Sequence, residues 1–163
     1  MNADLGEALG YLGRYSGAAS PEMIKPAEPG RSARPEPYRY DDRYWRWRLY
    51  MAQRIAEKMD SELMGIKAAY VIGSTNSGSA GPGSDIDLII HFSGNDEQKQ
   101  QLQLWLEGWS QALAEMNYLK TGYASDGLLD IHIVTDQDIA NKTSFAVKIG
   151  SITDPALPLK IKE

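Results

Sequence analysis

The sequence contains no cysteine and only two histidines in 163 residues. The absence of cysteine excludes a disulfide framework, a thiolate metal site and a cysteine nucleophile. The two imidazoles, His91 and His132, are too few for a multi-histidine zinc site, whereas 22 acidic residues supply carboxylates for a hard cation such as magnesium. Any metal chemistry should therefore be carboxylate chemistry.

Long apolar runs are also missing. No stretch approaches the roughly 18 consecutive apolar residues of a membrane span, and Asp4 and Glu7 lie where a secretory signal would carry positive charge. With 42% hydrophobic and 24% charged residues, the composition is typical of a soluble globular protein. We therefore expect a cytoplasmic protein that contacts no membrane.

Positive charge is scarce in most of the chain. The net charge of −5 argues against a protein that holds nucleic acid by a globally positive field. Residues 31–58 nevertheless hold seven of the eight arginines and Lys58 against four acids, a balance of +4, so the rest of the chain sums to −9. The arginines are thus gathered in the N-terminal third.

Composition divides the chain into two parts. Residues 1–37 are rich in Gly, Ala, Ser and Pro and show little apolar periodicity, which is typical of a partly disordered or extended arm. From Asp41 onward the apolar residues become periodic, and Asp41 or Asp42 can cap a helix. We therefore expect one folded domain over residues 38–163.

The periodicity of this domain predicts helices alternating with strands, that is, an α/β (α+β) fold with a small mixed β-sheet and helices packed against it. The expected helices cover 42–62, 95–117 and 136–148, and the expected strands cover 66–72, 85–92 and 128–134. Residues 157–161 are expected to form a terminal strand or tail, and residues 73–83 a loop. A short edge strand over 119–123 is one interpretation of a turn-rich stretch.

Two of these helices have an apolar face. The spacing predicts that the face of each is buried against the sheet. The apolar positions are Tyr44, Trp47, Met51, Ile55 and Met59 in the first, and Leu102, Leu106, Trp109, Leu113 and Met116 in the second.

The stretch 71–92 carries the residues suited to chemistry. Strand alternation puts Asp85 and Asp87 on one face and apolar residues on the other. Two neighbouring carboxylates repel each other, and a divalent ion is their natural neutraliser. Upstream, Gly73 and Ser74 open a loop of small residues, in which amide groups and the Ser74 hydroxyl can approach phosphate oxygens.

The order Gly73-Ser74, then Ser84-Asp85-Ile86-Asp87-Leu88, resembles the signature of the polymerase-beta-like nucleotidyltransferase superfamily, and the domain is similar in size to its minimal members. That family has a third carboxylate on a neighbouring strand. Asp130 has this setting in the sequence LLDIHIV, where strand alternation favours it over the nearby alternatives Asp126 and Asp136.

The resemblance implies a site and a reaction. Asp85, Asp87 and Asp130 would be catalytic and would hold Mg²⁺ (or Mn²⁺), and Asp130 would also orient or deprotonate an acceptor hydroxyl. Gly73, Ser74 and Ser84 would bind an NTP, with ATP the expected nucleotide. A nucleoside monophosphate would pass to a hydroxyl acceptor, a protein side chain or a small molecule, with release of pyrophosphate.

Two departures from the family pattern leave alternatives open. Residues 75–84 contain no basic residue, so triphosphate charge must be balanced elsewhere, and no substantial second domain follows. One alternative is therefore a non-catalytic nucleotide-binding or interaction module that works with a separate helical partner protein. Another is an enzyme that tails RNA 3′ ends, although nucleic acid is not the favoured partner.

Two further features have competing interpretations. His91 and His132 fall on the same strand faces as the aspartates and could approach one another beneath the site, but hydrogen-bonded supporting histidines are the simpler interpretation. The basic, aromatic segment 38–48 combines charge with stacking surfaces, as single-stranded nucleic-acid grooves do. The alternatives are contact of one or two of its arginines with triphosphate or acceptor, and packing of the helix or an interface with a partner.

Overall fold

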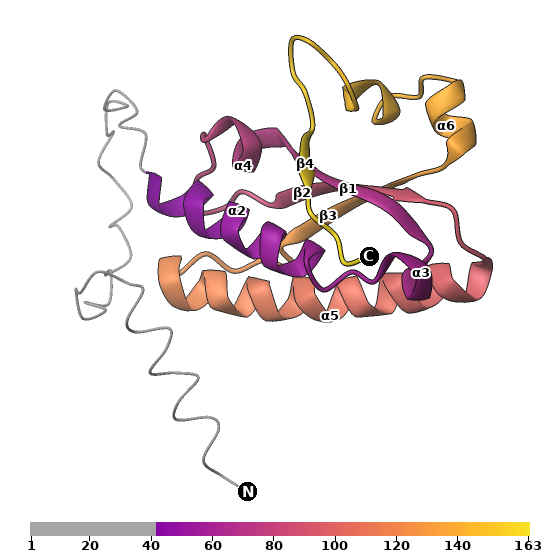
Figure 1. Cartoon of the computed structure of the whole chain (residues 1–163). Coiled ribbons are helices and arrows are strands. Elements are labelled where there is room, and N and C mark those ends of the chain that lie inside the picture. The colour runs from indigo at the N-terminus through magenta and orange to yellow at the C-terminus, as the bar shows by residue number, and fades with distance from the viewer. Residues whose placement is uncertain (1–41) are drawn as a thin grey trace, which may run out of the picture. The chain divides into compact units, whose positions relative to one another are not determined.

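The computed structural model describes residues 42–163, and these form a mixed sheet with the two long helices on one face (Figure 1). The predicted α/β (α+β) class is confirmed. The proposed arm over 1–37 and residues 38–41 lie outside the described residues. The elements are α2 Asp42–Ala56, α3 Ser61–Met64, β1 Ile66–Ile72, α4 Gly73–Ser77, β2 Ile86–Phe92, α5 Asp96–Thr121, β3 Leu129–Val134, α6 Asp136–Ala140, η1 Ala146–Lys148 and β4 Leu157–Leu159.

The sheet has four strands in the order β3-β2-β1-β4. Strand β1 runs antiparallel to both β2 and β4, whereas β2 and β3 are parallel. A parallel pair needs a long crossover, and α5 supplies it between β2 and β3. The central strands are therefore β2 and β1, and they carry the most buried side chains of the sheet.

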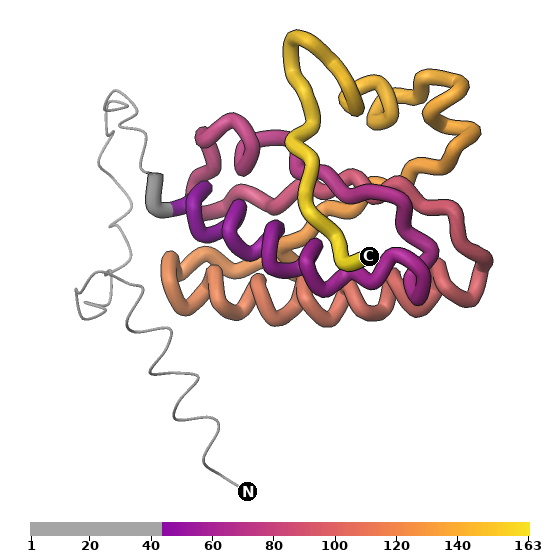
Figure 2. The backbone as a smooth tube through the Cα atoms, viewed as in Figure 1, coloured from indigo at the N-terminus to yellow at the C-terminus, as the bar shows by residue number. Residues whose placement is uncertain are grey.

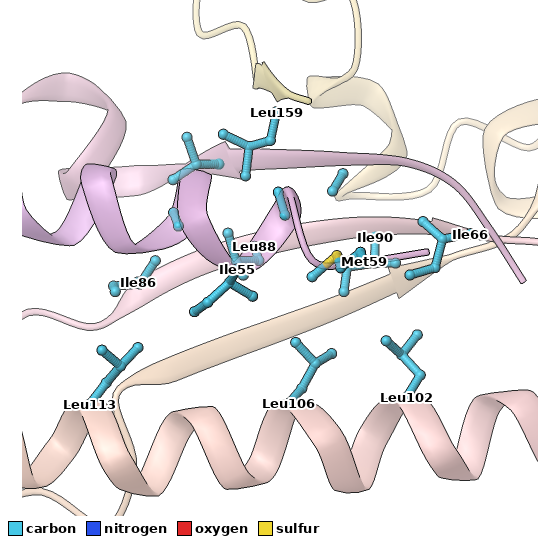
Figure 3. Close-up of a cluster of buried hydrophobic side chains, with 14 of the residues drawn as sticks. Ile55, Met59, Ile66, Ile86, Leu88, Ile90, Leu102, Leu106, Leu113 and Leu159 are labelled. Atoms are coloured by element: carbon cyan, nitrogen blue, oxygen red, sulfur yellow. The ribbon is translucent and has the colours of Figure 1, made fainter. Parts of the chain in front are cut away.

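The main core lies between the sheet and the two long helices. Figure 3 shows Leu102, Leu106 and Leu113 of α5 facing the sheet across from the strand residues. Ile55 and Met59, from α2 and the turn that follows it, close the same layer and are completely buried. The predicted face of α5 is buried at its three leucines, whereas Trp109 and Met116 are only partly covered. In the first predicted helix Ile55 and Met59 are fully buried, whereas Tyr44, Trp47 and Met51 are only partly covered.

A smaller hydrophobic cluster covers the opposite face of the sheet. Ile72, Ile89 and Val134 pack there against Ala146 and Ala156, from the chain that follows β3. The C-terminal residues then return to the helix side of the sheet. Figure 2 shows the end of the chain beside the α2–α3 connection, where the backbones of Lys162 and Asp60 form an isolated parallel β-bridge. The predicted terminal strand forms as β4, but it ends at Leu159 rather than at Ile161.

The first predicted helix is too long, because α2 ends at Ala56 rather than at 62. Amides of Lys58 and Met59 bond carbonyls only three residues back, which tightens the chain into a turn. Asp60 then caps a second short helix, α3, by accepting a hydrogen bond from the Leu63 amide at 3.0 Å.

The predicted boundaries around α5 and α6 are also corrected. Helix α5 continues to Thr121 and ends at Gly122, which has a φ of 75°. The edge strand over 119–123 is therefore wrong. Helix α6 covers only Asp136–Ala140, since Lys142 has a φ of 53° and cannot continue it, and η1 replaces its last part. No helix within residues 42–163 is long and apolar enough to span a membrane.

Candidate active site

Three adjacent strands bring the predicted site residues together. In the β1–β2 register Ile72 lies opposite Asp87, so Gly73 begins where β1 ends beside that carboxylate. In the parallel β2–β3 register Asp87 lies opposite Asp130. Residues separated by more than forty positions in the chain are thus neighbours on one face of the sheet.

The Asp87 carboxylate leaves no room for a side chain at position 73, so this residue must be glycine. Its φ of 67° lies in the left-handed region that favours glycine. A Cβ built on Gly73 would overlap Oδ2 of Asp87 and lie 3.0 Å from its Cγ. The missing side chain at Gly73 therefore makes room for the Asp87 carboxylate itself.

The predicted loop 73–83 is partly helical. Gly73–Ser77 form α4, which ends at Gly78 with a φ of 78°. The carbonyl of half-buried Ser74 accepts hydrogen bonds from the amides of Ser79 and Ala80, which folds the following residues back over the helix. The small residues allow the chain to fold this tightly, whereas the sequence pattern alone predicts a loop.

The predicted nucleotide-binding serines differ in setting. Ser84 Oγ accepts a hydrogen bond from the Gly81 amide at 2.9 Å, so this hydroxyl closes a turn within the loop. Ser74, by contrast, is the second residue of α4 and adjoins Gly73. Of the two, Ser74 lies nearer in sequence to the Gly73–Asp87 contact.

Asp87, Asp130 and His132 form an acidic cluster with a ligand atom from each lying within 4.8 Å of the others. Two carboxylates and one imidazole suit a divalent cation. Asp85 is not part of this cluster, but its carboxyl interacts electrostatically with Asp130. The three predicted aspartates are therefore brought to one region, with Asp87 and Asp130 at its centre.

Burial and mutual repulsion perturb these acids. Burial raises the pKa of Asp87, the neighbouring charges of Asp130 and Asp85 raise it further, and His132 and Lys148 oppose the rise. Burial also raises the pKa of Asp85, with Asp130 adding to the rise and Arg48 opposing it. A region that destabilises its own carboxylates is one in which a cation is stabilised.

His132 belongs to the site more closely than the sequence indicated. Its Nε2 lies 3.4 Å from Asp130 Oδ2, and its ring stacks on Phe145 at 3.7 Å between centroids. His91 instead pairs with Asp136 at 2.7 Å. The two histidines thus have separate acidic partners, and the strand alternation that put His132 beside Asp130 was the signal for its place.

The alternative third acids have other contacts. Asp136 bonds both Lys67 and His91 at the start of α6. The carbonyl of Asp126 accepts a hydrogen bond from Gln111 in the connection before β3. Neither belongs to the cluster with Asp87, so Asp130 is the third acid that the topology brings into place.

A buried serine fixes the start of β3. Ser110 on α5 accepts hydrogen bonds at 3.0 Å from the amides of both Leu128 and Leu129. Gly127 passes so close that a Cβ on it would lie 2.6 Å from Ser110 Oγ. Helix α5 therefore sets the position of the strand that carries Asp130.

Two cations near the acids were not predicted as individual residues. Arg48 lies on the apolar face of α2, four residues from both Tyr44 and Ala52, and is 0% exposed. Burial lowers its pKa to about 10, although Asp85 opposes the shift. Lys148 of η1 is half-buried, interacts electrostatically with Asp87, and pairs with Asp154 at 2.7 Å.

Comparison with known families agrees with this geometry. A sequence-family model described as nucleotidyltransferase domain matches residues 52–134, which include β1, α4, β2, α5 and β3. The chain therefore belongs to the nucleotidyltransferase domain family, as its resemblance predicted. No curated protein and no solved structure matches the chain significantly. Arg48, Phe145 and Lys148 lie outside the matched residues.

Proposed function

We propose that this protein is a metal-dependent nucleotidyltransferase that moves a nucleoside monophosphate from an NTP, with ATP the first nucleotide to test, to a hydroxyl on a protein side chain or small molecule. The observation that carries the proposal is the contact of Gly73 with Asp87, beside Asp130, within a nucleotidyltransferase domain. We assign the activity to the domain over residues 38–163.

The acidic cluster fits a divalent cation by its donor set. Asp87 and Asp130 offer hard oxygen ligands at short range, and the repulsion that raises the pKa of Asp87 is relieved by a cation. We assign Asp85, Asp87 and Asp130 as the residues that would hold Mg²⁺ or Mn²⁺. When bound, such an ion neutralises phosphate charge and favours ionisation of a coordinated hydroxyl.

The transfer itself assigns distinct roles to the protein groups. The acceptor oxygen forms a bond to the α-phosphorus, and the bond from that phosphorus to the bridging oxygen of the β-phosphate breaks, releasing pyrophosphate. The carboxylate of Asp130 takes the acceptor proton, and His132, at 3.4 Å, orients that carboxylate. Positioning and charge neutralisation dominate such reactions.

The triphosphate needs binding groups that the loop lacks, since residues 75–84 contain no basic side chain. We assign Gly73, Ser74 and Ser84 to its backbone and hydroxyl contacts. Lys148 is the cation we assign to phosphate charge: Asp154, its ion-pair partner, is 65% exposed, so a phosphate can replace that partner at little cost. Arg48 is completely buried and cannot reach substrate.

The test uses each α-labelled nucleoside triphosphate with Mg²⁺ or Mn²⁺, and a cell lysate as acceptor pool. Wild type should release pyrophosphate and transfer label, and D85A/D87A should lose at least about 100-fold of both. Asp126→Ala is the matched control, because Asp126 is an acid outside the cluster, and this variant should behave as wild type.

Separating the labelled lysate into protein, small-molecule and RNA fractions identifies the acceptor. Label in RNA ends would replace the proposed acceptor with an RNA 3′ end. Absence of label and of pyrophosphate with every nucleotide, from a protein shown to be folded, would contradict the enzyme proposal and leave the non-catalytic module.

A further inference from the structure

Arg48 is a fully buried guanidinium whose hydrogen bonds all go to uncharged oxygens. Buried charges are normally paired with an opposite charge, because desolvation is costly. An arginine kept in such a place must do something that an apolar side chain of similar size cannot. Its hydrogen-bond partners show what that is.

The guanidinium joins α2 and α5 to the loop that precedes Asp85. Its Nε donates to the Ser84 carbonyl at 2.9 Å, and Nη2 donates to the Pro82 carbonyl at 3.2 Å. Its other donors bond the Tyr44 carbonyl at 3.0 Å and Asn117 Oδ1 at 2.8 Å. One side chain thus ties two helices to the carbonyls of Pro82 and Ser84 in the same loop segment.

Asn117 on α5 completes the attachment. Its Nδ2 donates to the same Pro82 carbonyl at 2.9 Å and to the Tyr123 carbonyl at 3.3 Å. Like Arg48, Asn117 is completely buried. The Pro82 carbonyl therefore accepts from two buried side chains, which fixes its direction closely.

The loop needs this external support because of its composition. Gly81, Pro82, Gly83 and Ser84 have little side-chain surface to pack, and glycine gains the most conformational freedom when released. Further along the chain, the Asp85 carbonyl accepts a hydrogen bond from Thr75 Oγ1 at 3.5 Å, and the Ile86 amide donates to the Leu128 carbonyl at 2.8 Å. Asp85 therefore lies between the carbonyls that Arg48 bonds and the first residue of β2.

We propose that Arg48 is a positioning residue for Asp85: by bonding the Ser84 and Pro82 carbonyls, it holds residues 81–84 so that the Asp85 carboxylate stays beside Asp130. This inference rests on the proposed function, in which Asp85 is a metal ligand. The guanidinium remains charged at neutral pH, because its pKa is lowered only to about 10, and it therefore also offsets part of the repulsion at Asp85.

The test compares Arg48→Met with Arg54→Met, because Arg54 is on the same helix but pairs with Glu57 at the exposed surface. Two readouts apply to the full chain: hydrogen exchange of the peptide covering residues 79–88 without metal, and Mn²⁺ affinity by paramagnetic-resonance titration. In R48M, exchange should rise and the Mn²⁺ dissociation constant should increase about 10-fold or more. R54M should match wild type in both.

Asn117→Ala is the second variant, since it removes one support of Pro82 but keeps the Arg48 charge. It should change both readouts in the same direction as R48M, by a smaller factor, and it keeps the proposal testable if R48M does not fold. Arg48→Lys keeps charge without the planar set of donors, and it should restore Mn²⁺ affinity only in part.

Either of two results in folded R48M would overturn the proposal: loop exchange equal to that of wild type, or raised exchange with unchanged Mn²⁺ affinity. Full recovery of affinity in R48K would also overturn it, because charge alone would then suffice. Failure of the proposed function gives a different result, in which wild type and D85N/D87N bind Mn²⁺ equally weakly while loop exchange still reports on Arg48.

Discussion

Replacing Gly73 with alanine should impair the site more than it impairs the fold. An L-residue at the φ of 67° seen at Gly73 costs about 1–2 kcal/mol. In a domain of this size, that corresponds to a fall in Tm of roughly 5–10 °C. The new Cβ would also overlap Oδ2 of Asp87, so the carboxylate must move by about 1 Å to regain van der Waals distance.

That displacement sets the expected loss of activity. A misplacement of about 1 Å in a reacting constellation can cost on the order of 100-fold in rate. Pyrophosphate release at saturating Mg²⁺ should therefore fall by about that factor in Gly73→Ala, at a temperature where calorimetry shows the variant to be folded. Mn²⁺ affinity should fall with it, because Asp87 is a proposed ligand.

Gly122→Ala is the matched control for backbone strain. Gly122 has a φ of 75°, and a Cβ on it would meet no atom within 4 Å. It should lose a similar amount of stability and keep wild-type turnover. If Gly73→Ala keeps turnover within about threefold of Gly122→Ala, the close contact with Asp87 does not matter for catalysis and the reasoning is refuted.

Three further predictions concern charge and packing. Because the folded pKa of Asp87 lies above its unfolded value, the native state binds more protons between these two pKa values, and wild-type stability falls as pH rises through that window. Asp87→Asn should therefore raise the Tm of the metal-free protein in calorimetry, more at pH 8 than at pH 4, while abolishing Mn²⁺ binding. An equal or lower Tm would contradict the repulsion at Asp87. Lys148→Met should raise the KM for the nucleotide about 10-fold in steady-state kinetics, since it removes a charge interaction of roughly 1.4 kcal/mol. The control Lys99→Met changes an exposed lysine of α5 and should leave the KM unchanged. Equal KM values in the two variants would remove Lys148 from the phosphate site. Leu106→Ala should cost about 2–5 kcal/mol in urea unfolding because Leu106 is 2% exposed, and Leu104→Ala, at 74% exposed, less than about 0.5; similar losses would mean that α5 packs by another face.

The sequence predicted the elements well where periodicity was strong. Strand β1 begins and ends as expected, and the buried leucines of α5 are those that the spacing indicated. The errors fall where local capping or backbone geometry decides. Asp60 starts a new helix where the apolar spacing ran on, and small residues fold into α4 where composition indicates a loop.

By itself, the sequence determined the family and indicated the candidate site residues Gly73, Asp85, Asp87 and Asp130 by their order and local spacing. Strand alternation predicted that Asp85 and Asp87 share a face, but Asp85 lies just before β2, which begins at Ile86. These features are local, so a pattern that repeats every two residues is enough to expose them.

Only the tertiary structure decided which distant groups meet these acids. The parallel register sets Asp130 opposite Asp87, and the crossover of α5 carries Asn117 to the same loop carbonyl that Arg48 bonds. In the sequence Arg48 is one arginine of a basic segment; in the fold it is buried and bonds the loop that precedes Asp85. Contacts across 34 to 69 residues depend on how helices pack on the sheet, and no local pattern encodes that.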